Sequence, residues 1–364
     1  MLSRISKSTV DLQIEVKEMT EIFAPKESHS VSYTTPLVSV IISNYNYGCY
    51  LAQAIESVLA QSYQNLELIV VDDGSKDTSS EVIDFYQGCL AAIFQNNGGQ
   101  GAALNAGIAR SQGEIICFLD ADDYFHPDKL AKIVAAFAAH PQWVQIAHCW
   151  LSVNRDSVVT NATLKSLSQG NVRELLLQRG KYAWAPTSGL AYRREALLQV
   201  LPIPPRPRAA DTYLTATVPF YGEVGSIHEA LMYYRLHGDN RRAHSDNIAY
   251  LIEQREDTAY CINQAAAKVG FSDRFDIQQD VDYRSLKALQ QGGGNWLEAL
   301  KILWLSLQES LVIRRSLSDT INRLLQRGIC ALYPDEGKAI LRLGLRGYLR
   351  LKLSRQAPKN LTTS

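Results

Sequence analysis

The sequence predicts an α/β protein, with a doubly wound, mostly parallel sheet followed by a C-terminal helical region. Between residues 37 and 123, short β-branched runs alternate with helix-like segments four times, and each run ends in a polar cluster. Beyond about residue 242 the apolar spacing is helical throughout. Alternating strands and helices favour a parallel sheet, because each helix returns the chain to the end where the next strand begins.

The elements of the first half follow from local pattern. The apolar run 37–42 is short and β-branched, which is typical of a buried strand. In 50–61, apolar residues recur at i, i+3, i+4 and i+7, which predicts a helix with one apolar face. The same alternation predicts strands at 67–71, 91–94 and 114–119, and helices at 79–86 and 102–109.

The second half is predicted to be helical. We expect three parts in the chain: a loosely ordered leader, 1–36; an α/β domain, 37–240; and a helical C-terminal region, 241–364. Segment 294–300 resembles part of a helical-hairpin repeat, but a single copy does not predict a solenoid. Helix-like spacing covers 247–268, 280–290, 295–308, 317–332 and 338–353.

Composition excludes several classes of protein. The 364 residues carry 37 Lys and Arg against 37 Asp and Glu, so no excess of cations is available to grip nucleic acid, and no nucleic-acid partner is expected. The six cysteines are scattered without a C-x-x-C pair, which argues against a zinc cluster or disulfide scaffold. The first 30 residues lack a signal-peptide core, and polar residues interrupt the uncharged stretch 133–154. A cytoplasmic location is expected.

An Asp-x-Asp pair follows the predicted strand 114–119. In extended backbone, residues i and i+2 face the same way, so Asp120 and Asp122 can converge on one hard divalent cation, Mg or Mn. Such an ion would neutralise a departing diphosphate. The alternative is a solvated acidic turn in which Asp123 caps the next helix.

Two further loops follow strand ends. In Asp72-Asp73-Gly74-Ser75, a carboxylate could accept a hydrogen bond from a uracil imide or a ribose hydroxyl, although a tight turn is the alternative. The glycine-rich loop 96–101 matches neither the P-loop nor the dinucleotide fingerprint. Its glycines are expected to permit close approach of backbone to a ligand or a neighbouring strand.

Taken in order, these motifs resemble family 2 glycosyltransferases of the GT-A fold over about residues 37–240. The resemblance implies a metal-dependent inverting enzyme that moves one sugar from a nucleotide-sugar, UDP-sugar favoured, to a hydroxyl of a glycan or lipid-linked acceptor. Such enzymes act in glycan, cell-envelope or exopolysaccharide biosynthesis. The chain lacks the Q-x-x-R-W segment and membrane spans of processive synthases, so a single addition is expected. The matching segments are 38–46, 57–62, 70–75, 96–107 and 118–123 with 127–130.

The resemblance also implies roles for individual residues. The acceptor side lies at Ser188 and Gly189, within a strand whose small residues leave room for the incoming sugar. His237 belongs to a closing Y-R-x-H-x-x-N segment, 234–240, and would help to bind metal or diphosphate. The nucleotide-sugar contacts are Ser43, Tyr45, Asp73, Asn105 and Asp120, and the metal ligands are Asp120, Asp122 and His237.

Asp211 is the expected catalytic base. In an inverting enzyme a carboxylate removes the acceptor hydroxyl's proton as the oxygen attacks the anomeric carbon. The family places this residue in a Glu-Asp pair, and here Ala210 replaces the Glu. The alternative for Asp211 is an N-cap of a helix that begins at Thr212.

The tail 338–356 carries six Lys and Arg and no Asp or Glu. Basic residues and leucines each recur every fourth position, so a helix here could lie on an anionic membrane surface. The alternative is a terminal helix that docks its leucines on the protein. Two alternative functions remain open: a sugar nucleotidyltransferase, although the 43–48 turn has no basic residue, and a binding module without transfer activity, consistent with Ala210.

Overall fold

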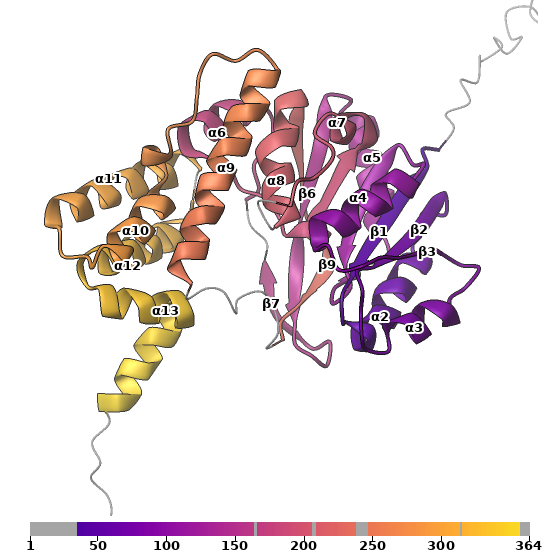
Figure 1. Cartoon of the computed structure of the whole chain (residues 1–364), viewed down its shortest axis with the longest axis horizontal. Coiled ribbons are helices and arrows are strands. Elements are labelled where there is room, and N and C mark those ends of the chain that lie inside the picture. The colour runs from indigo at the N-terminus through magenta and orange to yellow at the C-terminus, as the bar shows by residue number, and fades with distance from the viewer. Residues whose placement is uncertain (1–34, 164–165, 206–208, 238–246, 314, 357–364) are drawn as a thin grey trace, which may run out of the picture. The chain divides into compact units, whose positions relative to one another are not determined.

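The computed structural model describes residues 35–163, 166–205, 209–237, 247–313 and 315–356. By its contacts the chain divides into residues 1–35 and 36–364, and residues 1–34, nearly all of the predicted leader 1–36, lie outside the described residues. The second unit contains a nine-stranded sheet in the order β3-β2-β1-β4-β8-β6-β9-β5, with β7 paired to β6. Strands β1, β2, β3, β6, β7 and β9 of this sheet are labelled in Figure 1. The predicted α/β class is confirmed.

The first four strands form a parallel half-sheet. Strand β1 lies between β2 and β4, and its register places Ser43 beside Asp120 and Asn44 beside Asp72. The polar residues at the ends of these strands therefore meet at one edge of the sheet. The elements are β1 (Val38–Asn44), α2 (Gly48–Leu59), β2 (Leu66–Asp72), α3 (Ser79–Phe85), β3 (Ala91–Phe94), α4 (Gln100–Arg110) and β4 (Ile115–Asp120).

The second half of the sheet is mixed. Strand β8 runs antiparallel to β4 and β6, whereas β9 runs parallel to β6. The short strand β5 pairs with β9, Tyr124 opposite Tyr233, so the end of β9 returns beside the residues that follow β4. The elements are β5 (Tyr124–Phe125), α5 (Lys129–Ala139), β6 (Trp143–Val153), β7 (Val159–Thr163), α6 (Arg173–Arg179), η1 (Thr187–Gly189), β8 (Leu190–Arg193), α7 (Arg194–Leu198), α8 (Ala210–Thr217), η2 (Val218–Tyr221) and β9 (Glu223–Arg235).

The main core lies on the parallel strands, where the apolar residues of β1 and β4 are almost fully buried. Helix α4 packs unusually close to this sheet at Gly107. A Cβ on that residue would lie 2.4 Å from Ile41 Cγ2, so only glycine fits without a shift of the helix. This contact fixes the position of α4, whose first residue reaches the candidate site described below.

The C-terminal half is helical, as predicted. Helix α9 packs against α8, and α10, α11 and α12 share a separate apolar cluster. The predicted helix 338–353 is wrong in one respect, because α13 is interrupted at Gly344, where φ is 70°. The helices are α9 (Ile248–Lys268), the turn η4 (Ile277–Gln279), α10 (Val281–Gln290), α11 (Trp296–Val312), α12 (Leu317–Leu332) and α13 (Pro334–Gln356).

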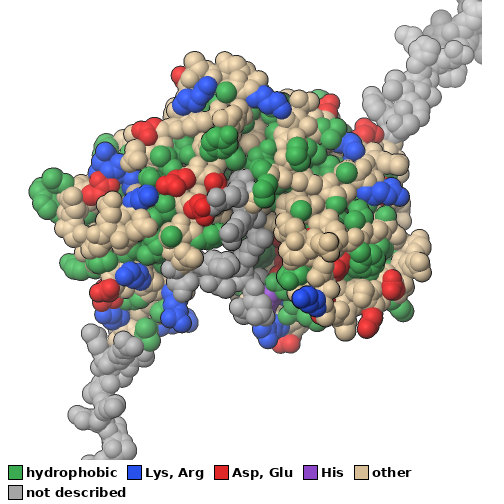
Figure 2. Space-filling model, in the orientation of Figure 1, with side chains coloured by type: hydrophobic (Ala, Val, Ile, Leu, Met, Phe, Trp, Pro, Cys, Tyr) green, Lys and Arg blue, Asp and Glu red, His purple; other side chains and the backbone are tan. Residues whose placement is uncertain are grey.

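Hydrophobic side chains remain at the surface over α11 and α12 (Figure 2). Leu300, Trp304, Leu325 and Tyr333 are more than half exposed and line an apolar groove of about 700 Å³. Across the described segments, no helix has both the length and the hydrophobicity needed to span a bilayer.

Candidate active site

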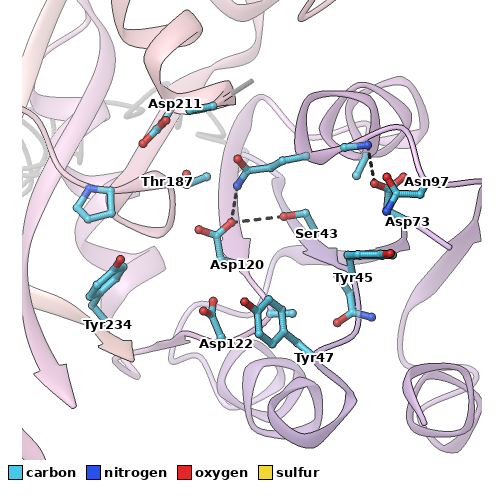
Figure 3. A pocket seen from close by; sticks show the side chains of 17 residues that line it. Ser43, Tyr45, Tyr47, Asp73, Asn97, Asp120, Asp122, Thr187, Asp211 and Tyr234 are labelled. Carbon is cyan, nitrogen blue, oxygen red and sulfur yellow. Dashed lines mark hydrogen bonds between the residues drawn. The ribbon is translucent and has the colours of Figure 1, made fainter. Parts of the chain in front are cut away.

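A pocket of about 550 Å³ opens at the carboxyl ends of the parallel strands (Figure 3). Ser43 reaches it from the end of β1, Asp73 from the turn after β2, and Asp120 from the end of β4. Open α/β sheets bind ligands at this edge, because loops diverge there and leave a crevice. The pocket is therefore the candidate functional site.

Three carboxylates cluster at the centre of this region. Oxygens of Asp120, Asp122 and Asp123 lie within 4.8 Å of one another. Asp120 and Asp122 line the pocket, and the Asp120 Oδ1 atom accepts hydrogen bonds from Gln100 Nε2 at 2.7 Å and from Ser43 Oγ at 3.4 Å. Both predicted acidic ligands, Asp120 and Asp122, thus line the same pocket.

Asp123 faces inward instead. Its carboxylate accepts hydrogen bonds from Ser188 Oγ at 2.7 Å and from the Arg235 backbone N–H at 2.9 Å. Burial, together with the neighbouring Asp122 and Asp120 charges, raises the pKa of Asp123 well above its ordinary value. The N-cap interpretation of Asp123 is wrong, because the next helix, α5, begins at Lys129 after Asp128.

His237 lies against the acidic pair. Its Nε2 atom is 2.9 Å from Asp122 Oδ2, and its side chain is 1% exposed. The ring stacks on Tyr50 and meets Tyr47 edge-on, each at 5.4 Å between centroids. Pairing of β5 with β9 brings this residue to Asp122 across 115 positions of sequence. Residues 238–240 of the predicted closing segment lie outside the described residues.

The far end of the pocket is formed by the β1 and β2 loops. Tyr45 is 44% exposed there, beside Asn97 and Asp73 (Figure 3). The Asp73 carboxylate accepts hydrogen bonds from Gln95 Nε2 and from the backbone N–H groups of Gly98 and Gly99, at 2.7 to 2.9 Å. Asp73 therefore ties the glycine-rich loop to the end of β2 as well as lining the pocket.

Asp211 stands on another wall, in the first turn of α8. Figure 3 shows Asp120 between Asp211 and Asp73. The N-cap interpretation of Asp211 is wrong, because α8 begins at Ala210 after Ala209, although Asp211 Oδ1 accepts a hydrogen bond from the Thr212 N–H at 2.7 Å. Ala210, which stands where the family has Glu, is buried and does not line the pocket. The Asp211 carboxylate still lines it.

Three predicted contact residues lie behind the pocket wall. Ser188 and Gly189 are buried in η1, and the neighbouring Thr187 lines the pocket in their place. Both ends of the Asn105 side-chain amide bond to the Ile203 backbone, at 2.8 Å each. Asn105 therefore holds a loop and is not among the residues that line the pocket.

The predicted site residues leave out several that line the pocket, among them Tyr47, Gln100, Thr187 and Tyr234. A signal existed for two of them. Tyr47 belongs to the same polar turn as Tyr45, and Tyr234 opens the closing Y-R-x-H segment. Gln100 is the first residue of α4, and its contact with Asp120 depends on where that helix packs.

Comparison with known proteins now identifies the family. Residues 39–201 match the family model Glycosyl transferase family 2. An uncharacterized glycosyltransferase of Nostoc sp. strain PCC 7120 is 39% identical over 269 residues, which cover 70% of this chain and 83% of the relative. The chain belongs to glycosyltransferase family 2. The protein is thus an enzyme, a glycosyltransferase.

Other similarities to this glycosyltransferase cover less or are more distant. An uncharacterized glycosyltransferase of Haemophilus influenzae is 48% identical over 101 residues, or 27% of this chain and 40% of that relative. Crystallised TarS 1–349 of S. aureus covers 84% of this chain and 83% of its own, with 18% identity and a TM-score of 0.49. A Pyrobaculum calidifontis mannosyltransferase, solved with GDP-Man and Mn²⁺, covers 92% of this chain and 94% of its own, with 17% identity and a TM-score of 0.48.

Proposed function

We propose that this glycosyltransferase moves one sugar from a UDP-sugar to an acceptor hydroxyl, with inversion at the anomeric carbon and with Mg or Mn as cofactor. One observation carries the proposal: a single pocket holds the Asp120–Asp122 pair at the strand ends and the Asp211 carboxylate on another wall. The first group suits a metal diphosphate, and the second suits an acceptor hydroxyl. The further proposal that this chemistry serves glycan or cell-envelope synthesis rests on the family alone.

The donor set at the acidic pair fits a hard divalent cation. Mg²⁺ and Mn²⁺ prefer carboxylate oxygens, and imidazole nitrogen is also a ligand for such ions. His237 Nε2 is within hydrogen-bond distance of Asp122 Oδ2, at 2.9 Å, so the imidazole is next to the acidic pair. We assign Asp120, Asp122 and His237 as ligands, whereas Asp123 is engaged by Ser188 and Arg235. When bound, the ion would neutralise the diphosphate leaving group.

The nucleoside is assigned to the far end of the pocket. The exposed Tyr45 ring offers a face for stacking a base, and Ser43 lies between that end and Asp120. The Asp73 carboxylate can accept a further hydrogen bond from an imide N–H or a ribose hydroxyl. Asn105 supports the pocket indirectly, because its side-chain amide holds the backbone of the loop at Ile203.

Asp211 is proposed to act as the general base. It takes the proton of the acceptor hydroxyl while that oxygen forms a bond to the anomeric carbon. The bond from this carbon to the nucleotide's phosphate oxygen breaks on the opposite face, and the electron pair leaves with the diphosphate. Thr187, carried on η1 above Ser188 and Gly189, forms the wall beside the incoming acceptor.

Two variants test the function. With UDP and Mn²⁺, Asp211→Asn should bind with near wild-type affinity in isothermal titration calorimetry, yet its transfer or donor hydrolysis should fall about 10²–10⁴-fold because the base is lost. Asp122→Asn should lose Mn²⁺-dependent nucleotide binding. A thermal-shift screen of UDP, GDP, dTDP and CDP sugars identifies the donor, since a bound ligand raises the melting temperature. Activity undiminished by EDTA would contradict the metal, and a product with retained anomeric configuration would contradict inversion.

We also propose a lipid-linked acceptor and peripheral contact with the cytoplasmic face of a membrane through 338–356. The first half of α13 packs on the protein, with Ile340 fully buried. Beyond Gly344, Leu349 and Leu351 are exposed together with Arg350 and Lys352, which supports contact with an anionic surface. Sedimentation with phosphatidylglycerol vesicles, for the chain with and without residues 345–364, measures this contact.

A further inference from the structure

We propose that Arg235 is a positioning residue: its buried guanidinium holds the turn that carries Asp120 and Asp122 in metal-binding geometry before an ion arrives. Arg235 is the last residue of β9, and it does not line the pocket. The inference rests on the proposed metal dependence of the enzyme.

Arg235 is buried to an unusual degree for its type. It is 1% exposed and is among the largest fully buried side chains of the described residues. Arginine is seldom fully buried, because a guanidinium loses its hydration unless its N–H groups find partners inside the protein. We expect a protein to bear this loss of hydration where the guanidinium holds neighbouring segments in place by hydrogen bonds that a smaller apolar side chain could not make.

On one side, Arg235 grips the acidic turn. Its Nε donates to the Asp122 carbonyl at 2.8 Å, and its backbone N–H donates to Asp123 Oδ1 at 2.9 Å. The other Asp123 oxygen accepts from Ser188 Oγ, which in turn accepts from the Asp120 N–H at 3.0 Å. The guanidinium thereby holds the Asp122 backbone, whereas the Arg235 backbone N–H and Ser188 hold the Asp123 carboxylate and the Asp120 N–H.

On the other side, the same guanidinium is anchored to two separate segments. Its Nη1 donates to the Arg155 carbonyl at 2.9 Å and to Ser157 Oγ at 3.1 Å, both in the turn after β6. Its Nη2 donates to Gln53 Oε1 in α2 at 2.5 Å. The centroid of the Tyr50 ring, in the same helix, lies 4.6 Å from Arg235 Cζ. The acidic turn cannot shift without disturbing α2 and the 154–157 turn.

A lysine cannot reproduce this arrangement. The planar fork of arginine directs N–H groups toward three segments at once, whereas an ammonium is a single point of donation. Partners that orient metal ligands from behind are worth about 10–100-fold in metal affinity in characterised sites. We therefore expect Arg235→Lys to weaken binding of the ion rather than to remove a ligand.

The experiment counts free Mn²⁺ by electron paramagnetic resonance during titration of the full chain with MnCl₂. Arg235→Lys should weaken Mn²⁺ binding about 10–100-fold. Arg193→Lys is the matched control. The Arg193 guanidinium donates to the Trp143 and Phe137 carbonyls at 2.8 and 2.7 Å, and Arg193 pairs with Ile115, at the opposite end of β4 from Asp120.

The outcomes separate the two proposals. Arg193→Lys should lower the melting temperature yet keep Mn²⁺ affinity within about twofold of wild type, because its contacts lie away from the turn. Wild-type affinity in folded Arg235→Lys would overturn the inference while leaving the metal proposal intact. Absence of Mn²⁺ binding by the wild type would instead overturn the metal proposal and, with it, this inference. If Arg235→Lys does not fold, Gln53→Ala decides: weaker Mn²⁺ binding supports the inference, and unchanged binding overturns it.

Discussion

Lys129, the first residue of α5, is buried beside Ser188, the residue whose hydroxyl bonds Asp123. It is fully buried, donates from Nζ to the Ser188 carbonyl at 2.5 Å, and packs over the Phe125 ring at 3.5 Å. Burial lowers the pKa of Lys129 to about 7, against the opposing influence of Cys117 and Asp123. The lysine therefore loses its proton in the folded protein at a pH where the unfolded chain still holds it.

This difference predicts an unusual pH dependence of stability. Between pH 7 and 9 the unfolded state binds more protons at Lys129 than the folded state does, so the free energy of unfolding should rise, by at most about 1.4 kcal/mol per pH unit. Lys129→Met should lack this component of the rise. Urea unfolding at pH 7, 8 and 9 measures both proteins, and identical slopes for the two would contradict the prediction.

Individual site residues were predictable where the chemistry is local. Asp120 and Asp122 follow a strand at a spacing that lets both carboxylates face the same way, so their place in one pocket was visible in three consecutive residues. The roles of Ser188 and Asn105 were not predictable, because their partners lie 65 and 98 positions away. Whether a side chain lines the pocket or lies behind its wall depends on which distant segment packs against that side chain.

At the scale of elements, helix α4 has its position set by Gly107. Alanine normally stabilises a helix interior by about 1 kcal/mol relative to glycine. Here we expect the opposite sign, because the added Cβ would lie 2.4 Å from Ile41 and push the helix off the sheet. Gly107→Ala should lower the free energy of unfolding by about 1–3 kcal/mol in urea denaturation.

The chain offers a matched control in α12. A Cβ on Gly328 would lie 3.4 Å from Leu303 Cδ2, an ordinary contact. Gly328→Ala should therefore stabilise the protein by up to about 1 kcal/mol. Equal and positive effects at both glycines would show that α4 does not depend on close approach to β1.

Elements with strong periodicity were predictable, and others were not. Helix α12 begins and ends where its apolar spacing indicates. Strand β9 alternates poorly between buried and exposed residues, since it pairs with β6 along one part and with β5 along another. The predicted helix 338–353 ran through Gly344 although glycine weakens a helix, and α13 breaks there because Gly344 adopts a left-handed conformation.

At the scale of the whole molecule, a largely buried ionic cluster connects the segment after α6 to the C-terminal helices. Lys181, which follows α6, lies 2.6 Å from Asp282 of α10 and 2.8 Å from Glu309 of α11. Arg327 of α12 lies 2.6 Å from the same Asp282. Against the opposing effect of burial, Lys181 and Arg327 lower the pKa of Glu309 below its ordinary value. The carboxylate is therefore stabilised in its charged form.

This cluster predicts loss of stability in acid. A carboxyl whose pKa is lowered by folding contributes stability above its ordinary value of 4.5, and that contribution is lost as pH falls through the folded pKa. Glu309→Gln should lose about 3 kcal/mol at pH 7 because Lys181 and Arg327 are left with one carboxylate partner fewer, and its melting temperature should fall less steeply between pH 5 and 3 than that of the wild type.

A control for the acid prediction lies in α13. Glu336 pairs with Lys352 at 2.6 Å on the exposed surface, where solvent screens the interaction. Glu336→Gln should leave both the melting temperature and its acid dependence close to wild type. If this variant and Glu309→Gln behave alike, the buried cluster does not govern acid stability.

Helix α4 contacts one wall of the pocket and, on another side, the segment that precedes α8. Gln100 at its beginning meets Asp120, and Asn105 clasps the backbone at Ile203, in the segment that precedes α8 and Asp211. Five residues of helix separate these attachment points by about 7.5 Å along its axis. Because α4 is rigid and packs closely on the sheet at Gly107, it fixes the distance between these two contacts. A bulkier sugar would then have to be accommodated by smaller side chains at lining positions such as Thr187 or Tyr234, since a wider separation would require α4 to leave its position on the sheet.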